Sequence, residues 1–172
     1  MDTFIKSLKS FAKEDFPVKK VSDFILNSNF SKKTLAKYSH FNENTFARNM
    51  IYKDQDFQIL LICWSPGQLA PIHGHEGEKC WARVQDGNLQ ICNYEEVSSD
   101  PLELNMLQEL SCSPGFLDGP ADIHSVENIT DKFATSLHVY AKPYDACDIY
   151  DIEKGTVDRT KLSYHSIDGI LC

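Results

Sequence analysis

Residues 71–77 read PIHGHEG and place two histidines, His73 and His75, two positions apart. On an extended backbone, side chains at this spacing point to the same face of a strand, so both imidazoles would face one point. A third histidine, His124, lies in the stretch IHSVEN (residues 123–128), which also has the composition of a strand. Two neighbouring strands of a small barrel would bring the three rings together.

Three neutral imidazoles on one side of a divalent metal leave coordination positions open for other ligands. That arrangement suits a catalytic metal site better than a closed structural one. An isolated pair of histidines two residues apart is equally compatible with exposed or hydrogen-bonded side chains that bind nothing. The sequence around the pair is therefore needed to distinguish a metal site from histidines that bind nothing.

Short β-rich runs separated by turn residues occupy the chain from about Phe46 onwards. The expected strands are DFQILLICW (56–64), KCWARV (79–84), LQICNY (89–94), IHSVEN (123–128) and FATSLHVYA (133–141), and turn residues mark SPGQLAP, QDGN and SPGFLDGPAD. Several short strands at this spacing predict a sandwich or a small barrel, which can enclose a pocket for a small ligand.

The first 38 residues have a different pattern, with apolar side chains at helical spacing. Two such groups, Phe4, Leu8, Phe11 and then Val21, Phe24, Ile25, are interrupted by Pro17 and by residues 27–31. They predict two or three short helices packed on the outside of the barrel. A chain of 172 residues with 42% hydrophobic content suits a single domain. We divide that domain into an N-terminal helical segment (1–45) and a β-barrel with C-terminal strands (46–172).

The charge balance of 17 basic and 25 acidic residues, without a Lys/Arg cluster, argues against a nucleic-acid partner. The N-terminal stretch MDTFIKSLKSFAKEDF carries a charge every few residues, and no apolar run approaches membrane-spanning length. We therefore expect a soluble cytoplasmic protein without a membrane partner. In a reducing compartment the six cysteines are expected as thiols, and Cys63 and Cys92, inside apolar runs, as small hydrophobic residues of the core.

The residues around the histidines resemble the two sequence motifs of the cupin superfamily. The first motif is matched in spacing by Gly67, His73, His75, Cys80 and Gly87, and the second more loosely by Gly115, Pro120, His124 and Asn128, with a turn one residue shorter than usual. Most cupins carry glutamate where this chain has Cys80, and Glu76 or Glu78 remains an alternative as a fourth ligand. The resemblance implies a mainly β fold, a small barrel of the jelly-roll type, but it names no reaction.

A narrower resemblance, to the cysteine dioxygenase family, extends from about Phe46 to the C-terminus. The matching stretches are ARN (47–49), ICW (62–64), HGHEGEKC (73–80), QDGNL (85–89), IHSVEN (123–128), SLHVY (136–140) and PYDAC (143–147). The resemblance implies an Fe(II) ion held by His73, His75 and His124. It also implies a thioether crosslink between Cys80 and Tyr140, because animal-type members of the family carry this cysteine and tyrosine pair.

Further residues receive roles through the same resemblance. Tyr140, Cys80 and His138 are expected at the reacting centre, with Ser136, His138 and Trp64 behind Tyr140 and the metal ligands. Ser136, His138 and Tyr140 alternate along one expected strand, so their side chains should share its inner face. Each of these residues, taken alone, could also be an ordinary core residue with its polar atom satisfied.

Arg48 corresponds to the arginine that binds the substrate carboxylate in cysteine dioxygenases. Its planar guanidinium suits two-point recognition of a carboxylate. Related dioxygenases that prefer mercaptopropionate have glutamine at this position, so Arg48 favours cysteine. The chain departs from the family at Phe46, where many members carry a tyrosine that supports carboxylate binding.

Together, the resemblance implies an enzyme that oxidises L-cysteine with O2 to cysteine sulfinate, and we expect a monomer. The alternatives are a dioxygenase for another small thiol such as 3-mercaptopropionate, and a zinc or manganese cupin that acts as a hydrolase or isomerase. A non-catalytic ligand-binding cupin is the remaining alternative. Neither of the last two would account for the pairing of Cys80 with Tyr140.

Overall fold

Three helices precede a long series of strands in the computed structural model, which describes residues 1–172 apart from the side chain of Ala121. The helices are α1 Asp2–Ala12, α2 Val18–Asn27 and α3 Lys32–Ala36. The strands are β1 Ala47–Lys53, β2 Gln58–Trp64, β3 Leu69–His73, β4 Lys79–Asp86, β5 Leu89–Ser99, β6 Leu102–Cys112, β7 Leu117–Ala121, β8 Ile123–Glu127, β9 Ala134–Ala141, β10 Ala146–Asp151, β11 Thr156–Lys161, β12 Ser166–Ile167 and β13 Ile170–Leu171.

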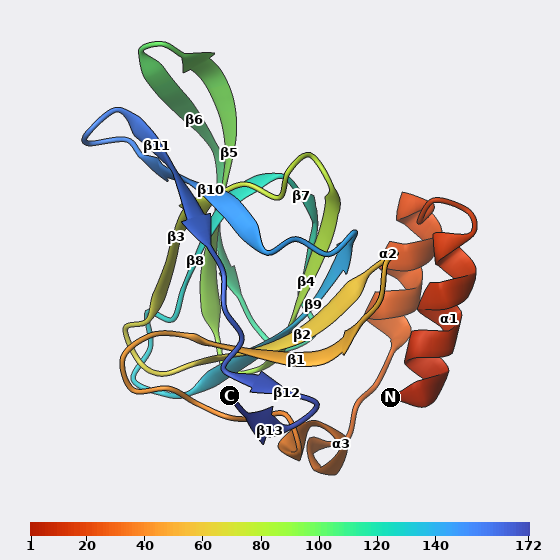
Figure 1. Cartoon of the computed structure of the whole chain (residues 1–172). Coiled ribbons are helices and arrows are strands. Elements are labelled where there is room, and N and C mark those ends of the chain that lie inside the picture. The colour runs from red at the N-terminus through yellow and green to blue at the C-terminus, as the bar shows by residue number, and fades with distance from the viewer.

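The strands form two sheets that face each other (Figure 1). One sheet has the order β13-β12-β1-β2-β9-β4-β7 and the other the order β11-β10-β3-β8-β5-β6. Apart from the parallel pair β1 and β12, the ladders are antiparallel. This is the expected mainly β cupin fold, in which the space between the sheets becomes the barrel interior.

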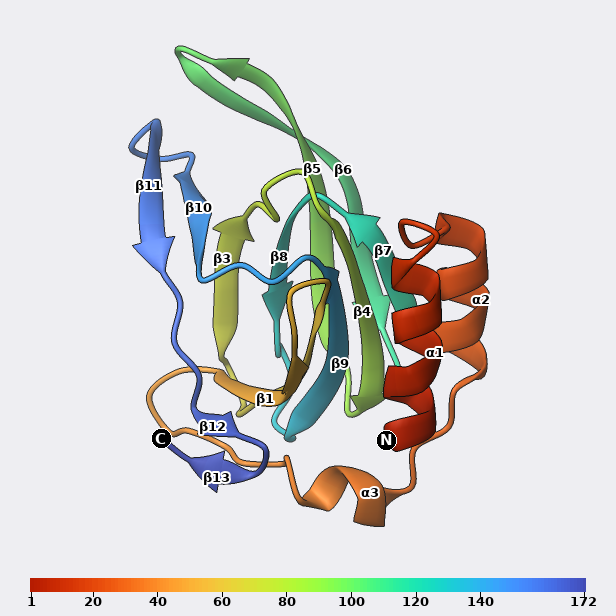
Figure 2. The same ribbon diagram turned by 45° about the vertical axis from the view of Figure 1, so that its right-hand side comes forward.

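Helices α1 and α2 lie against the outer face of the first sheet, beside β4 and β7 (Figure 2). Both helices are short and amphipathic, and they bury one apolar stripe each, Phe4 and Leu8 from α1 and Val21 and Ile25 from α2. Pro17 precedes α2 and Asn27 ends it, as the sequence predicted. The helices thus pack on the outside of the barrel, which confirms that part of the fold prediction.

Strand β2 is buried along its whole length because its two faces contribute to two different cores. Ile59, Leu61 and Cys63 pack under the helices. Their neighbours in the chain, Leu60, Ile62 and Trp64, point into the space between the sheets. Because both faces of β2 are buried, its alternating side chains are all apolar, and the strand appears in the sequence as one continuous apolar run.

Most expected strands are present, with shifts of a few residues at their ends. The expected turn between residues 79–84 and 89–94 is also present, and Gly87 in it has a positive φ of 73°. A Cβ at Gly87 would collide with the backbone of Phe133 and Ala134, so glycine is required there. Strands β6 and β7 were not expected, and β7 corrects the expected turn SPGFLDGPAD, because residues 117–121 pair with β4. Strand β6 lies at the edge of its sheet. It pairs with β5 in a long hairpin that projects from one end of the barrel (Figure 1).

Within the residues that the structure describes, no helix has both the length and the apolar character needed to cross a membrane.

Candidate metal centre

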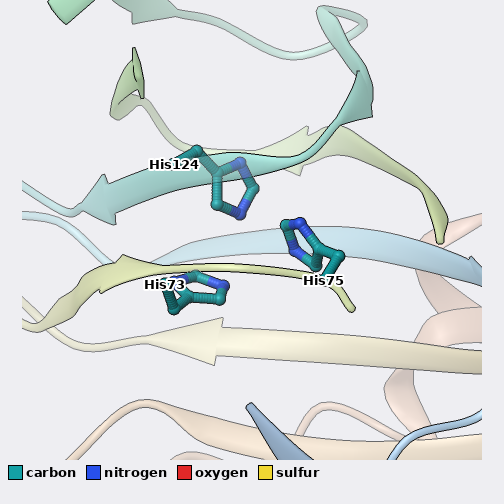
Figure 3. A group of neighbouring side chains, drawn as sticks. All are labelled: His73, His75 and His124. Atoms are coloured by element: carbon teal, nitrogen blue, oxygen red, sulfur yellow. The ribbon is translucent and has the colours of Figure 1, made fainter. Parts of the chain in front are cut away.

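The three predicted histidines meet between strands β3 and β8 (Figure 3). His73 is the last residue of β3 and lies directly opposite His124 on β8. His75 follows just beyond the end of β3, so it is held by a loop rather than by the strand that the sequence suggested. The ring centroids are 4.7–5.1 Å apart, and one nitrogen of each ring lies within 4.8 Å of the others.

The hydrogen bonds of the three rings determine which nitrogen faces the centre. His73 Nδ1 donates to the carbonyl oxygen of Pro71 (2.8 Å), and His75 Nδ1 donates to that of Asp122 (2.6 Å). His124 Nδ1 bonds to a carboxylate oxygen of Asp118 at 3.0 Å. Because these oxygens only accept, each Nδ1 carries the proton and each Nε2 keeps its lone pair.

The Nε2 atoms fit a metal ion. His75 Nε2 is buried and has no hydrogen-bond partner among the described residues, which is costly unless another ligand is present. Burial, reinforced by the neighbouring His124, lowers the pKa of His73 to about 3 and that of His75 well below its usual range, so both rings are neutral at pH 7. Neutral imidazoles with outward protons fixed by acceptors are the form that binds divalent metals.

A small cavity of about 50 Å³ opens beside His73 and His124. Its polar lining comes from Arg48, His73, His124, His138, Tyr140, Tyr144 and Cys147, and its apolar lining includes Phe46 and Leu162. This volume accommodates a molecule of a few heavy atoms rather than a large cofactor.

Arg48 projects into the cavity from β1 and is only 8% exposed. Its Nη1 donates to the carbonyl oxygen of Ser163 (3.3 Å), and its guanidinium lies 5.4 Å from the ring centre of Tyr164. Nη2 is buried and has no hydrogen-bond partner among the described residues. A buried guanidinium with a free donor is suited to a small anion, because the donor otherwise stays unsatisfied.

A hydrogen-bonded line runs along β9 to the same cavity. Trp64 Nε1 donates to Ser136 Oγ (2.9 Å), Ser136 Oγ bonds to His138 Nε2 (2.8 Å), and His138 Nδ1 bonds to Tyr140 Oη (3.1 Å). The structure thus places the alternating residues of this strand on one face, as the sequence indicated. Burial lowers the pKa of His138 and raises that of Tyr140, so the ring is neutral and the phenol keeps its proton.

Cys80 lies directly opposite Tyr140 on the neighbouring strands β4 and β9. Directly opposite residues of antiparallel strands share a face, with Cβ atoms about 4.5–5.5 Å apart. Both side chains are buried, and burial raises the pKa of the Cys80 thiol well above its usual range. Cys80 is a free thiol in the structure.

Glu76 and Glu78, the alternative carboxylate ligands, lie apart from the three-histidine cluster. Glu76 forms an ion pair with Arg159, and Glu78 one with Lys142 at 3.1 Å. Phe46 stacks on Trp64, with ring centres 5.0 Å apart, and gives the cavity an apolar wall.

Sequence reasoning missed three residues of this site, Asp118, Tyr144 and Tyr164. Tyr144 lines the cavity next to Tyr140, with ring centres 5.1 Å apart, and Tyr164 lies beneath Arg48. Asp118 is buried and accepts from His124. The only sequence signal for Asp118 was an acidic residue six positions before a candidate ligand, in a stretch that was assigned to a turn.

The barrel and the three-histidine cluster together define a metal-binding protein of the cupin class. A solved structure from Klebsiella pneumoniae, described as an uncharacterized conserved protein with a double-stranded β-helix domain, shares the fold with a TM-score of 0.51. The two chains are 14% identical, and the match covers 78% of this chain and 91% of that one. At this identity the likeness supports the fold alone.

A family model described as cysteine dioxygenase type I matches residues 1–153. Cysteine dioxygenase type 1 of Homo sapiens is 28% identical over 142 residues, which is 78% of this chain and 70% of the human protein. The Bos taurus protein of the same name is 26% identical over 167 residues, or 93% and 82% of the two chains. The chain therefore belongs to the cysteine dioxygenase type I family and is an oxidoreductase of the thiol dioxygenase kind.

Proposed function

We propose that this chain oxidises L-cysteine with O2 to cysteine sulfinate at an Fe(II) ion held by His73, His75 and His124. The observation that supports this most strongly is the placement of three clustered imidazoles beside a buried arginine with an unpartnered donor. When bound, the ferrous ion would supply sites for the thiolate and for O2, and it would let the electrons that reduce O2 pass from the sulfur, which is oxidised to the sulfinate. The protein residues supply binding, orientation and exclusion of water.

Arg48 binds the carboxylate of the substrate in this proposal. Its free Nη2 is the donor for that contact, and burial strengthens the interaction because little water competes for it. Cysteine and 3-mercaptopropionate both carry a carboxylate, whereas cysteamine does not. If Arg48 binds the carboxylate, cysteine and 3-mercaptopropionate should be better substrates than cysteamine.

Tyr140 directs its phenol proton into the cavity. Ser136 has one hydroxyl proton, and if that proton goes to His138 Nε2, then His138 Nδ1 donates to Tyr140 Oη. The phenol proton is then free to point toward the substrate and O2. Trp64 can only donate to Ser136, which leaves the Ser136 hydroxyl proton free for His138 and favours this polarity.

The Cys80 and Tyr140 pair is the proposed site of a thioether crosslink. Their opposite positions on β4 and β9 support it, because the bond needs no rearrangement of the backbone. The crosslink would hold the Tyr140 ring in one orientation. Formation of the bond removes two electrons and two protons from the pair, which O2 at the ferrous site would accept.

Oxygen uptake by the iron-loaded protein tests the proposed function. We expect uptake with L-cysteine, one O2 per cysteine sulfinate formed, weaker activity with 3-mercaptopropionate and little with cysteamine. The variant His124→Ala should abolish uptake. Zinc- or manganese-dependent hydrolysis or isomerisation without oxygen uptake, or cysteine binding without turnover, would contradict the proposal and favour one of the other cupin functions.

A further inference from the structure

Asp118 is the only acidic side chain that is buried in the part of the chain that the structure describes, at 6% exposed. Burial of a carboxylate is costly unless hydrogen bonds and an opposite charge compensate for the lost hydration. Asp118 Oδ1 accepts from Asn93 Nδ2 at 3.1 Å, and Oδ2 accepts from His124 Nδ1 at 3.0 Å. Asn93 is uncharged, and with Nε2 left for a metal ion the His124 ring carries only its Nδ1 proton, so the hydrogen bonds of Asp118 are satisfied and its charge is not.

No positively charged side chain compensates for Asp118. Its one ion-pair contact among the described residues is with His124, and none of the described lysines or arginines lies within 4.0 Å of it. A cation bound at Nε2, on the opposite side of the His124 ring from Asp118, would supply the missing positive charge. There Nε2 faces His73 and His75 across the metal site.

The three ligand histidines therefore differ in the acceptor that their Nδ1 proton contacts. His73 and His75 each donate to a backbone carbonyl, which is a neutral acceptor. Only His124 donates to a carboxylate. A carboxylate partner draws the Nδ1 proton toward itself, makes Nε2 a stronger donor to a metal and reduces the net charge of the centre by one.

The position of Asp118 is fixed by three strands. It lies on β7 opposite Ala82 of β4, whose small side chain leaves room beside it, and Asn93 lies on β5 opposite His124. The next residue, Gly119, has φ of 129°, and a Cβ there would overlap the backbone oxygen of Cys80. Glycine thus allows β7 to approach β4 closely enough to bring the carboxylate beneath His124.

We propose that Asp118 is the charge partner of the metal centre, and that through His124 it sets the affinity of the site for a divalent cation. Asp118 touches neither the substrate nor the metal in this proposal, so it is a positioning residue. The inference rests on the three-histidine site of the proposed function, and it is independent of which thiol is oxidised. It holds for any divalent metal bound by the three Nε2 atoms.

The test compares Zn²⁺ affinity in the wild-type protein, Asp118→Asn and Asp131→Asn. Asparagine at position 118 keeps the shape and an accepting oxygen but loses the charge. Asp131→Asn removes the same charge at an exposed position in the loop after β8 and is the matched control. Competition with a chelator dye should show Asp118→Asn binding Zn²⁺ about 10- to 100-fold more weakly, and Asp131→Asn within about twofold of wild type.

Two further measurements separate a charge partner from a merely structural residue. The thermal midpoint of metal-free Asp118→Asn should stay close to that of the metal-free wild type, while the increase on adding Zn²⁺ should shrink. In Zn²⁺-loaded wild-type protein, the NMR signal of the His124 Nδ1 proton should be present and shifted furthest downfield of the three ligand histidines. This second measurement needs no variant, so it decides the question even if Asp118→Asn does not fold.

Unchanged Zn²⁺ affinity in a folded Asp118→Asn variant would overturn the inference, and so would the absence of a proton on His124 Nδ1. Oxygen uptake plays no part in these readouts. A protein that binds Zn²⁺ as described but shows no cysteine oxidation would refute the proposed function and leave the role of Asp118 intact. A protein that oxidises cysteine but whose Asp118→Asn variant binds Zn²⁺ as tightly as wild type would refute the role of Asp118 and leave the proposed function intact.

Discussion

Arg48 is buried beside the three-histidine cluster, where its Nη1 donates to Ser163 and its Nη2 has no hydrogen-bond partner among the described residues. The Nη1 bond holds the side chain, and Arg48 lines a cavity of small volume with its Nη2 still unpartnered. At the scale of the residue, this division explains how one arginine can be both rigid and available for a ligand. Substitution should therefore affect substrate binding more than folding.

The variant Arg48→Gln should lower kcat/KM for cysteine at least roughly 30-fold, because loss of a buried charged partner costs about 2–5 kcal/mol. Most of the change should appear in KM. The ratio of activity with 3-mercaptopropionate to activity with cysteine should rise. Initial rates of oxygen uptake over a range of substrate concentrations measure all three quantities.

Cysteamine provides the internal control for Arg48, because it has no carboxylate and its residual rate should be unaffected by Arg48→Gln. If wild-type protein oxidised cysteamine as efficiently as cysteine, the carboxylate contact assigned to Arg48 would be wrong.

The Cys80 and Tyr140 pair gives a second prediction at this scale. Wild-type protein exposed to iron, cysteine and O2 should separate into two bands under denaturing and reducing conditions, and Cys80→Ser should give one. Intact-mass measurement should show the crosslinked form about 2 Da lighter, because two hydrogen atoms are lost. If turned-over wild-type protein showed only the mass of the unmodified chain, the crosslink would be ruled out.

The clustering of the three histidines could be predicted from the sequence, whereas the contact of Asp118 with them could not. His73 and His75 belong to a local pattern, and the spacing of the motifs added His124 from another strand. The contact of Asp118 with His124 depends on how β7 lies against β4 and β8, and this follows from tertiary packing rather than from spacing in the sequence.

The C-terminal segment 162–172 is the element that holds Arg48 in place. Leu162 lines the cavity, Ser163 accepts from Arg48, and the Tyr164 ring lies beneath the guanidinium. Tyr164 is held in turn by its hydroxyl, which donates to Gln58 at 2.9 Å. The segment lies beyond the 153 residues that match the family model, yet it completes the cavity.

The variant Tyr164→Leu should raise KM for cysteine about threefold to tenfold, because the cation–π contact with Arg48 contributes about 0.5–2 kcal/mol. Tyr164→Phe keeps the ring and is the matched control, with a smaller change expected. Steady-state kinetics at saturating O2 distinguish the two variants. Equal KM values in Tyr164→Leu and wild type would show that the ring does not position Arg48.

The elements themselves were predictable to different degrees. Helices α1 and α2 and strands β2 and β9 have clear apolar periodicity or continuous apolar runs, and the structure confirms them. Strand β6 was missed because most of its side chains are exposed, although Leu102, Leu104, Met106, Leu110 and Cys112 do alternate along it. It is a strand because β5 provides a pairing partner, and such pairing cannot be derived from one segment alone.

For the whole molecule, the neutral histidines between the two sheets couple stability to pH. His73 has a pKa lowered from 6.5 to about 3, and burial lowers the pKa of His75 and His138 as well. Between about pH 3 and 6.5, the folded and unfolded pKa values of His73, the unfolded chain binds more protons than the folded chain. The free energy of unfolding therefore rises with pH in this window, and the contribution is complete above about 6.5.

The metal-free protein should accordingly lose thermal stability as the pH falls from about 6.5 toward 3. The variant His73→Gln removes one of the imidazoles that take up a proton on unfolding, so its thermal midpoint should fall less steeply with pH than that of wild type. Differential scanning calorimetry in the presence of a chelator measures both curves. Parallel curves would indicate that His73 is not held neutral by burial.

One metal ion bound jointly by His73, His75 and His124 is the central claim for the whole molecule. Diffraction from crystals of the iron-loaded protein, measured on both sides of the iron absorption edge, locates iron without reference to activity. We expect one anomalous peak at about 2.0–2.2 Å from the Nε2 atom of each of the three histidines. Iron bound elsewhere, or a peak that reaches only two of these nitrogens, would contradict it.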